Sequence, residues 1–152
     1  MVRDGQSGIM TNKPWLIASD EVSQCIANGA PIVALESTLI THGLPWPDNL
    51  ACAMAAQAAV RDEGAIPATI AILSGQITVG LSDSQLEALA HNKTALKVSR
   101  RDLAHVVARA ATGATTVAAT MWCADRAGIG IFATGGIGGV HRGADLTFDV
   151  SA

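Results

Sequence analysis

The sequence predicts an α/β fold in which helices cover both faces of a largely parallel sheet. Short apolar runs rich in β-branched residues alternate with stretches of helical periodicity, and this alternation is typical of strands joined by crossover helices. Several helical stretches also begin at a serine or aspartate and end at a glycine. Since 152 residues suffice for one hydrophobic core, we expect a layered α/β/α domain.

The first elements follow a polar N-terminal segment. Residues 1–14 lack periodicity and are expected to form a flexible leader, so that the folded part spans 15–152. Ser19 is a good N-cap for a short helix, and Gly29 is a good stop for it. The apolar run PIVALE at 31–36 predicts a buried strand that ends at a carboxylate.

The middle of the chain predicts a loop, a helix and a hairpin. Residues 37–47 contain a glycine and two prolines, so we expect no regular structure there. An alanine-rich helix is expected over 49–63. Two apolar runs, at 68–73 and 77–81, flank the sequence Ser-Gly-Gln, which predicts a β-hairpin.

The second half predicts further strands and helices. Ser82 begins a Ser-x-x-Gln capping box for a helix in which Leu86 and Leu89 face inward. The other expected elements are a strand at 95–99, helices over 99–113 and 115–127, and a strand at 129–134.

The composition argues against a nucleic-acid partner and for an oligomer. The net charge is −3 and the basic residues are scattered, so the chain lacks the basic patch that nucleic acid requires. Hydrophobic residues make up 49% and charged residues only 15%. This leaves little polar material for the surface of a monomer, so we expect a homo-oligomer or a piece of a larger assembly.

The sequence also predicts a cytoplasmic protein without membrane contact. Its N-terminus lacks the apolar core of a signal peptide, and no apolar run reaches the roughly 20 residues of a membrane span. The three cysteines lie far apart without the spacing of metal ligands. We therefore expect them to be buried thiols in a reducing compartment.

Several polar residues stand at the carboxyl ends of predicted strands, where α/β sheets bind ligands. They are Glu36, Lys97 with Ser99, and Thr134 with the glycines after it. Glu36 suits general acid or base chemistry, and the alternative is a strand-end glutamate that caps neighbouring amides. The run KVSRRD forms either a phosphate site or a solvated basic turn with a salt bridge.

The glycine-rich run GGIGGVHRG resembles a phosphate loop only loosely. A Walker A loop needs a lysine where Ala144 stands, and a Rossmann fingerprint needs a glycine where His141 stands. The glycines still allow backbone to approach a ligand closely, beside His141 and Arg142. Asp145 precedes the strand-like LTFDV and Asp149 lies near its end, and the two are either ligands of Mg²⁺ or Mn²⁺ or solvated loop carboxylates.

Taken together, the motifs resemble one family, the pseudouridine-5'-phosphate glycosidases, also called the indigoidine-synthase-A-like family. The resemblance runs from near Ile17 to the last residue and includes VALESTLITHG, IPATIAI, KVSRRDL, GATTVAATM and FATGGIGGVHRGADLTFDVSA. It implies an α/β/α fold, a homotrimer and a divalent cation, usually Mn²⁺. The implied reaction is reversible cleavage of the C–C glycosidic bond of pseudouridine 5'-phosphate to uracil and ribose 5-phosphate.

The resemblance also implies roles for individual residues. Glu36 would be the proton donor, His141 would lie beside the reacting centre, and Asp149 would bind the metal. The candidates for substrate binding are Lys97, Val117, Ser151 and, from its place after the last predicted strand, Thr134.

One expected residue has no counterpart in the sequence. The family's nucleophilic lysine follows the metal-binding aspartate, and this sequence ends at Ala152. Such a lysine captures C1 of the opened ribose as an imine and so supplies the electron sink for breaking a C–C bond. We therefore expect the N-terminal half of an incomplete domain, which releases no uracil alone. The alternatives are a non-catalytic sugar-phosphate-binding or assembly protein, and a sugar-phosphate hydrolase that uses Glu36 and Asp149 directly.

Overall fold

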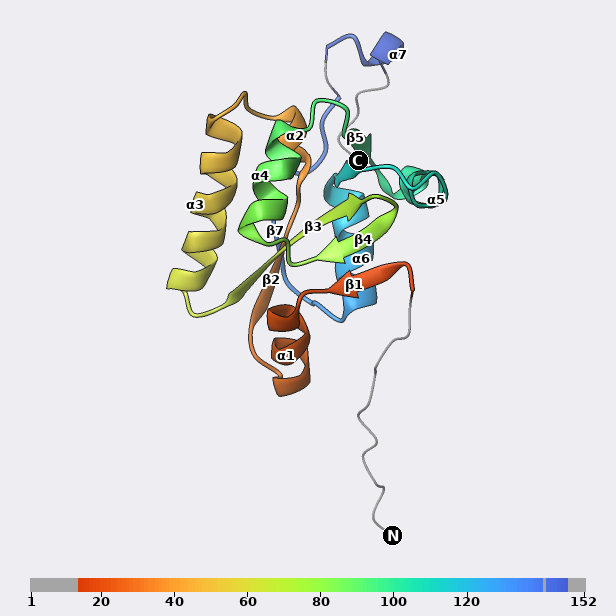
Figure 1. Cartoon of the computed structure of the whole chain (residues 1–152). Coiled ribbons are helices and arrows are strands. Elements are labelled where there is room, and N and C mark those ends of the chain that lie inside the picture. The colour runs from red at the N-terminus through yellow and green to blue at the C-terminus, as the bar shows by residue number, and fades with distance from the viewer. Residues whose placement is uncertain (1–13, 141, 148–152) are drawn as a thin grey trace.

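The structure is a computed structural model that describes residues 14–140 and 142–147 (Figure 1). The strands are β1 (Leu16–Ala18), β2 (Ile32–Leu35), β3 (Ile66–Leu73), β4 (Gln76–Val79), β5 (Leu96–Val98), β6 (Gly113–Thr115) and β7 (Phe132–Ala133). The helices are α1 (Asp20–Asn28), α2 (Thr38–His42), α3 (Asp48–Asp62), α4 (Asp83–His91), the 3-10 helix η1 (Arg100–Asp102), α5 (Leu103–Ala108), α6 (Val117–Ala127) and α7 (Ala144–Thr147).

The strands form one seven-stranded sheet that is largely parallel, as predicted. The pairs β1–β4, β2–β3, β2–β7 and β5–β6 are parallel. The pairs β3–β4 and β3–β6 are antiparallel, and the first of these is the predicted hairpin. β3 is therefore the central strand.

β3 changes its partner along one side. Residues 66–69 pair with β2 in parallel, and residues 71–72 pair with β6 antiparallel. The backbone N–H of Ser37 donates to the carbonyl of Thr115 (3.3 Å), so the ends of β2 and β6 lie against each other. The carboxyl ends of β2 and β7 thus meet those of β5 and β6 beside Ile70. We call this meeting point the fork.

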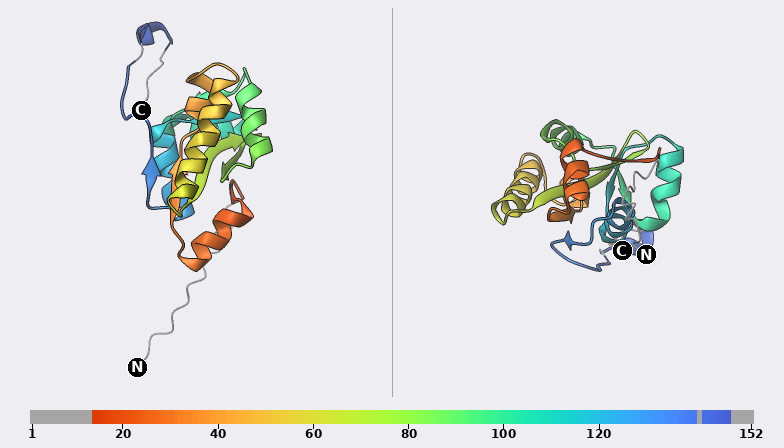
Figure 2. Two further views of the ribbon diagram at one scale, coloured as in Figure 1. Left: turned by 90° about the vertical axis from the view of Figure 1, so that its left-hand side faces the viewer. Right: turned by 90° about the horizontal axis from the view of Figure 1, so that it is seen from below.

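The two faces of the sheet bury separate apolar clusters, which confirms the α/β/α layers. Ile70 and Ile72 face α1, α5 and α6, whereas Ala71 faces α2, α3 and α4. Figures 1 and 2 show α3 on one side of the sheet and α6 on the other. The alternation follows from the two-residue period of a strand.

Local signals at two helix starts are confirmed. The Ser19 side chain accepts a hydrogen bond from Val22 at the start of α1, and Gly29 ends that helix in the left-handed conformation that favours glycine. Ser82 and Gln85 form the predicted capping box of α4. No helix within the two described ranges is long and apolar enough to cross a membrane.

The prediction of an irregular segment over 37–47 is wrong, because α2 lies within it. The glycine and prolines of this segment all follow His42, so they leave the residues before them able to form a helical turn. Ile40 is buried against α3 and α4, and this packing stabilises the turn.

The prediction that Gly113 ends a helix is also wrong. α5 ends at Ala108, and Gly113 begins the buried strand β6. A Cβ atom at Gly113 would overlap Cγ2 of Val98, so the glycine permits close strand pairing. β1 was not predicted, the helix expected from 115 begins at 117, and β7 is shorter than expected.

The prediction of a strand-like piece at 146–150 is wrong for its first two residues. Leu146 and Thr147 lie in α7, and the remaining residues of the piece lie outside the described residues.

Candidate functional site

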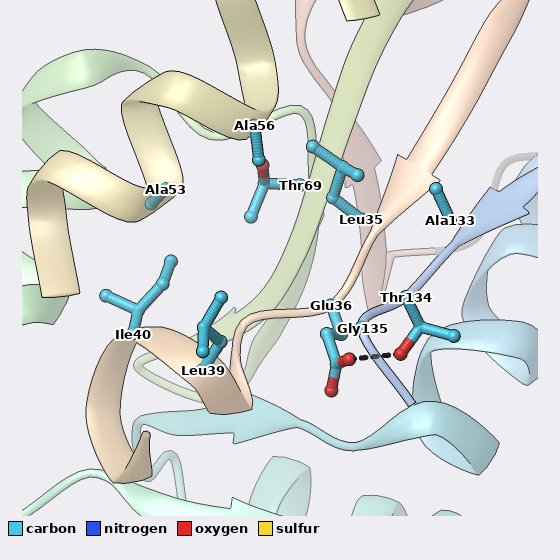
Figure 3. Close-up of a pocket in the computed structure, with 10 residues that line it drawn as sticks. All are labelled: Leu35, Glu36, Leu39, Ile40, Ala53, Ala56, Thr69, Ala133, Thr134 and Gly135. Atoms are coloured by element: carbon cyan, nitrogen blue, oxygen red, sulfur yellow. Dashed lines mark hydrogen bonds between the residues drawn. The ribbon is translucent and has the colours of Figure 1, made fainter. Parts of the chain in front are cut away.

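The ends of β2 and β7 bring two predicted site residues together. The parallel register pairs Leu35 with Ala133, so Glu36 and Thr134 leave the sheet side by side. The Thr134 hydroxyl donates to Oε1 of Glu36 over 2.5 Å (Figure 3). Both side chains are half-buried. The structure therefore brings these two strand-end candidates together, and their roles stay a prediction.

Thr134 is held in turn by the backbone that follows it. The N–H of Gly136 donates to Oγ1 of Thr134 over 3.2 Å, and the Gly136 carbonyl is a second acceptor for the Thr134 hydroxyl, at 3.0 Å. A hydroxyl can donate to a carboxylate and can also accept from a carboxylic acid. Glu36 therefore keeps this partner whether or not it holds a proton, as a group that transfers protons requires.

Glu36 and Thr134 lie at the edge of a small apolar cavity of about 190 Å³. α2 and α3 cover one side of the cavity, and the strand ends form the other (Figure 3). The lining residues are Leu35, Glu36, Leu39, Ile40, Ala53, Ala56, Thr69, Ala133, Thr134 and Gly135. Glu36 is the one ionisable group among them, so the cavity places a carboxylate beside an apolar space.

A cluster of buried hydroxyls fixes the backbone next to Glu36. The hydroxyls of Ser37 and Thr115 both donate to the Ile70 carbonyl, over 2.6 and 2.7 Å. The N–H of Thr115 donates to Oγ of Ser37 (2.8 Å), and the Thr120 hydroxyl donates to Oγ1 of Thr115 (2.9 Å). This network joins the end of β2 to β6 at the fork.

The hydroxyls of Ser37, Thr115 and Thr120 were not among the predicted site residues. Their positions were the available signal, since Ser37 directly follows Glu36 and Thr115 is the first residue of the helix predicted over 115–127. Buried hydroxyls next to apolar strands need hydrogen-bond partners, and here the Ile70 carbonyl and the Thr115 hydroxyl supply them.

Lys97 lies on the same face of the sheet as the cavity. It pairs with Ala114, which in turn pairs with Ala71, and residues in register share a face. Ala71 belongs to the cluster that α2, α3 and α4 cover. Lys97 is half-buried and is not one of the cavity-lining residues in the part of the chain that is described.

The turn after Lys97 shows the features of a helix start. The backbone N–H of Ser99 donates to Oδ2 of Asp102 (2.9 Å), which is one of the two hydrogen bonds of a capping box. Arg101 lies 3.7 Å from the Asp102 carboxylate. These contacts fit the alternative of a solvated basic turn, and they leave the phosphate role of Lys97 a prediction.

Val117 begins α6 and is buried. Within the described ranges it does not line the cavity, so its substrate-binding role also stays a prediction. It does lie near the fork, because α6 starts two residues after β6 ends.

Three other candidates, His141, Asp149 and Ser151, lie outside the described residues. Among residues 14–140 and 142–147, no group of three or more histidine, cysteine, aspartate or glutamate side chains could hold a metal ion. The expectation of Mn²⁺ at Asp149 is therefore untested.

The cysteines do not contribute reactive groups to the site. Cys123 is buried, and this burial raises the pKa of its thiol to about 12. Cys25 and Cys52 are half-buried, so the expectation of a buried thiol holds for Cys123 alone.

The chain matches the model of the family described as indigoidine synthase A like protein over residues 21–152. The pseudouridine-5'-phosphate glycosidase of Paracoccus denitrificans (strain Pd 1222) is 59% identical over 141 residues, which cover 91% of this chain and 46% of that protein. The enzyme of the same name from Solibacter usitatus (strain Ellin6076) is 60% identical over 132 residues, which cover 87% of this chain and 44% of that protein. The chain thus spans less than half the length of these relatives.

Two solved structures share the fold. The prealnumycin C-glycosynthase AlnA, in complex with ribulose 5-phosphate, has a TM-score of 0.74 and 46% identity, covering 90% of this chain and 44% of its own. An indigoidine synthase A (IdgA)-like protein from Thermotoga maritima has a TM-score of 0.73 and 37% identity, covering 87% of this chain and 44% of its own.

Proposed function

Because the chain belongs to the indigoidine synthase A-like family, we propose that it supplies the proton-donating part of a pseudouridine-5'-phosphate glycosidase site. The substrate would be pseudouridine 5'-phosphate, and the products would be uracil and ribose 5-phosphate. The names of the curated relatives support this reaction, and the sugar phosphate bound to the related C-glycosynthase supports the substrate class.

The observation that carries the proposal is the Glu36–Thr134 hydrogen bond at the cavity edge. When the C–C glycosidic bond breaks, its electron pair would stay with the base, and the base carbon would take a proton. C1 of the ribose would finally take the hydroxyl of a water molecule. Glu36 would donate that proton, and Thr134 would keep the carboxyl group oriented toward the substrate.

The sugar phosphate would bind at the fork, next to Glu36. Lys97 supports this placement because the residue is half-buried and lies on the same face of the sheet as the cavity. Val117 supports it because the start of α6 offers backbone N–H groups that favour an anion. Lys97 would contribute its charge, and Val117 would line the sugar site.

The remaining parts of the proposal rest on the family resemblance. Asp149 would bind Mn²⁺, Ser151 would contact the substrate, and His141 would lie beside the reacting carbon. The metal would stabilise negative charge on substrate oxygens. The assembly would be a homotrimer in the cytoplasm.

Calorimetry with ribose 5-phosphate tests the proposed site in this chain. We expect millimolar binding in the presence of Mn²⁺. Lys97→Met should abolish it by removing the ammonium group, whereas Glu36→Gln should retain it because the proton donor is not a phosphate ligand. Absence of binding by the unmodified chain at millimolar ligand would refute the site.

A uracil-release assay tests the division of roles. The chain alone with pseudouridine 5'-phosphate and Mn²⁺ should release no uracil, because the proposed nucleophilic lysine is not among its residues. Turnover by the chain alone would show that this assignment of the nucleophile is wrong.

A further inference from the structure

The glycine-rich segment after β7 extends away from the body of the molecule. We call residues 134–140 and 142–147, which include α7, the arm. In Figures 1 and 2 the arm extends beyond the sheet and its helices. Its large aliphatic side chains are almost fully exposed: Ile137 by 78%, Val140 by 77% and Leu146 by 82%. Elsewhere in the described residues the highest value for a large apolar side chain is 59%, at Ile131.

The backbone of the arm is equally open at its glycines, whereas Ala144 in α7 is buried. Within the described part of the chain, no atom lies within 4 Å of a Cβ built at Gly135, Gly136 or Gly138. By contrast, a Cβ at Gly75 or Gly113 would collide with neighbouring atoms. The arm therefore has space on its surface for another polypeptide.

Exposed aliphatic side chains of this size mark a protein contact, because soluble proteins rarely leave several of them together in water. The arm also adjoins a sheet edge. Among the described strands β7 pairs with β2 alone, so its other edge presents backbone groups that can pair with a further strand. The arm and this edge form one continuous surface.

The comparisons with relatives indicate what covers this surface. The family match extends through residue 152, and more than half of each curated relative lies outside the part that this chain spans. We propose that the arm and the outer edge of β7 are the docking surface for the part of an indigoidine synthase A-like domain that this chain does not span.

A second copy of this chain fits the surface less well. Two copies meeting through their arms would each contribute three large aliphatic side chains, whereas a standard interface engages about 20 to 30 residues of each partner. The remaining part of a domain can instead offer strands to β7 and an apolar face to the arm. This inference rests on family membership and the exposed arm, and it does not depend on the proposed reaction.

Co-expression tests the proposal. The full chain with an affinity tag is expressed with an untagged polypeptide that comprises the part of the Paracoccus denitrificans relative that follows the matched region. We expect the two to co-purify as a complex with equal amounts of each, measured by light scattering. Replacing Ile137 and Leu146 together by Asp should weaken the complex at least about tenfold, since these side chains would be buried on docking.

Ile26→Asp is the matched control. Ile26 is also an exposed aliphatic side chain, but it lies on α1, at the opposite end of the molecule from α7 (Figure 1). The control should leave the complex unchanged. Circular dichroism should show the same thermal unfolding for both variants as for the unmodified chain.

Three results would overturn the proposal. They are failure of the two polypeptides to co-purify, equal weakening by the arm and Ile26 variants, and self-association of the chain alone that the arm variant abolishes. The last result would make a second copy the occupant. A complex without uracil release would leave the docking inference intact and count against the proposed function. Sugar-phosphate binding by the chain without formation of a complex would support the proposed function and count against the docking inference.

Discussion

The fork and the arm both adjoin Glu36, and they differ in almost every physical respect. At the fork, Ser37, Thr115 and Thr120 are fully buried, and each hydroxyl has a partner within 3 Å. On the arm, Ile137 and Leu146 point into solvent, and the glycine backbone is open. Polar groups are thus inside and apolar groups outside, the reverse of the usual distribution.

The difference shows how Glu36, the proposed proton donor, is held in place. On one side Glu36 is followed by Ser37, whose hydrogen bonds fix the backbone to the centre of the sheet. On the other side its carboxylate has Thr134, the first residue of the arm. The backbone of Glu36 therefore belongs to the rigid core, while its hydrogen-bond partner belongs to the open segment.

Matched glycine substitutions should give the largest difference in stability between the fork and the arm. Gly113→Ala at the start of β6, the strand that ends at the fork, should lower the free energy of unfolding by about 2 to 3 kcal/mol, because the added methyl group would overlap Cγ2 of Val98. Gly136→Ala on the arm should change it by less than about 0.5 kcal/mol. Urea unfolding of both variants measures the difference, and equal losses would mean that the arm is packed as tightly as the fork.

Removing hydroxyls should have the next largest effect. Thr115→Val should cost about 2 kcal/mol, because it leaves buried partners of the network unsatisfied. Thr134→Val should cost less than about 0.5 kcal/mol, since water can replace the hydroxyl beside the half-buried Glu36. Thr115→Ser keeps the hydroxyl and serves as the control. If it is as unstable as Thr115→Val, packing of the methyl group explains the loss.

The surface ion pair between Arg61 and Glu21 lies outside the fork and the arm, and its effect on stability serves as a reference for both. Arg61 forms two hydrogen bonds to Glu21 that lower the pKa of that carboxyl group below its ordinary value. The pair therefore stabilises the fold at neutral pH, and the contribution is lost as the pH falls through the lowered pKa. Because both side chains are half-exposed, Glu21→Gln should cost only about 0.5 kcal/mol at pH 7 and progressively less at an acidic pH, as the carboxyl group of the unmodified chain takes up its proton. Urea unfolding at both pH values checks this, and a loss that persists in acid would contradict it.

The smallest effect on stability is expected on the arm itself. Leu146→Asp should leave the unfolding free energy within about 0.3 kcal/mol of the unmodified chain, because the side chain is already in water. Differential scanning calorimetry of the chain alone would check it. A clear drop in the unfolding temperature would show that Leu146 packs within this chain and would sharpen the boundary between arm and core.

Much of the fold could be predicted because its signals are local. Ser19, Gly29 and Ser82 specify helix ends through their own side-chain or backbone preferences. The apolar runs of β2 and β3 specify strands through burial. The family resemblance is confirmed by the match of the family model and by the curated relatives.

The missed elements depend on contacts between distant parts of the chain. α2 is stabilised by packing of Ile40 on α3 and α4, and β6 by pairing with β3 and β5. Neither α2 nor β6 has a local sequence pattern long enough to predict it. The same holds for the site: the strand-end rule found Glu36 and Thr134, but the bonds of Ser37 to Ile70 and Thr115 arise only from the fork.

The buried thiol of Cys123 has a practical consequence. It lies within α6 beneath the sheet, and a thiol with so high a pKa reacts only after it reaches water. Its labelling rate by a thiol reagent would therefore time the opening of the α6 layer in the unmodified chain, with no introduced probe. Cys25 and Cys52, which are half-buried, would be labelled earlier, and their labelling rates would serve as an internal reference for that of Cys123.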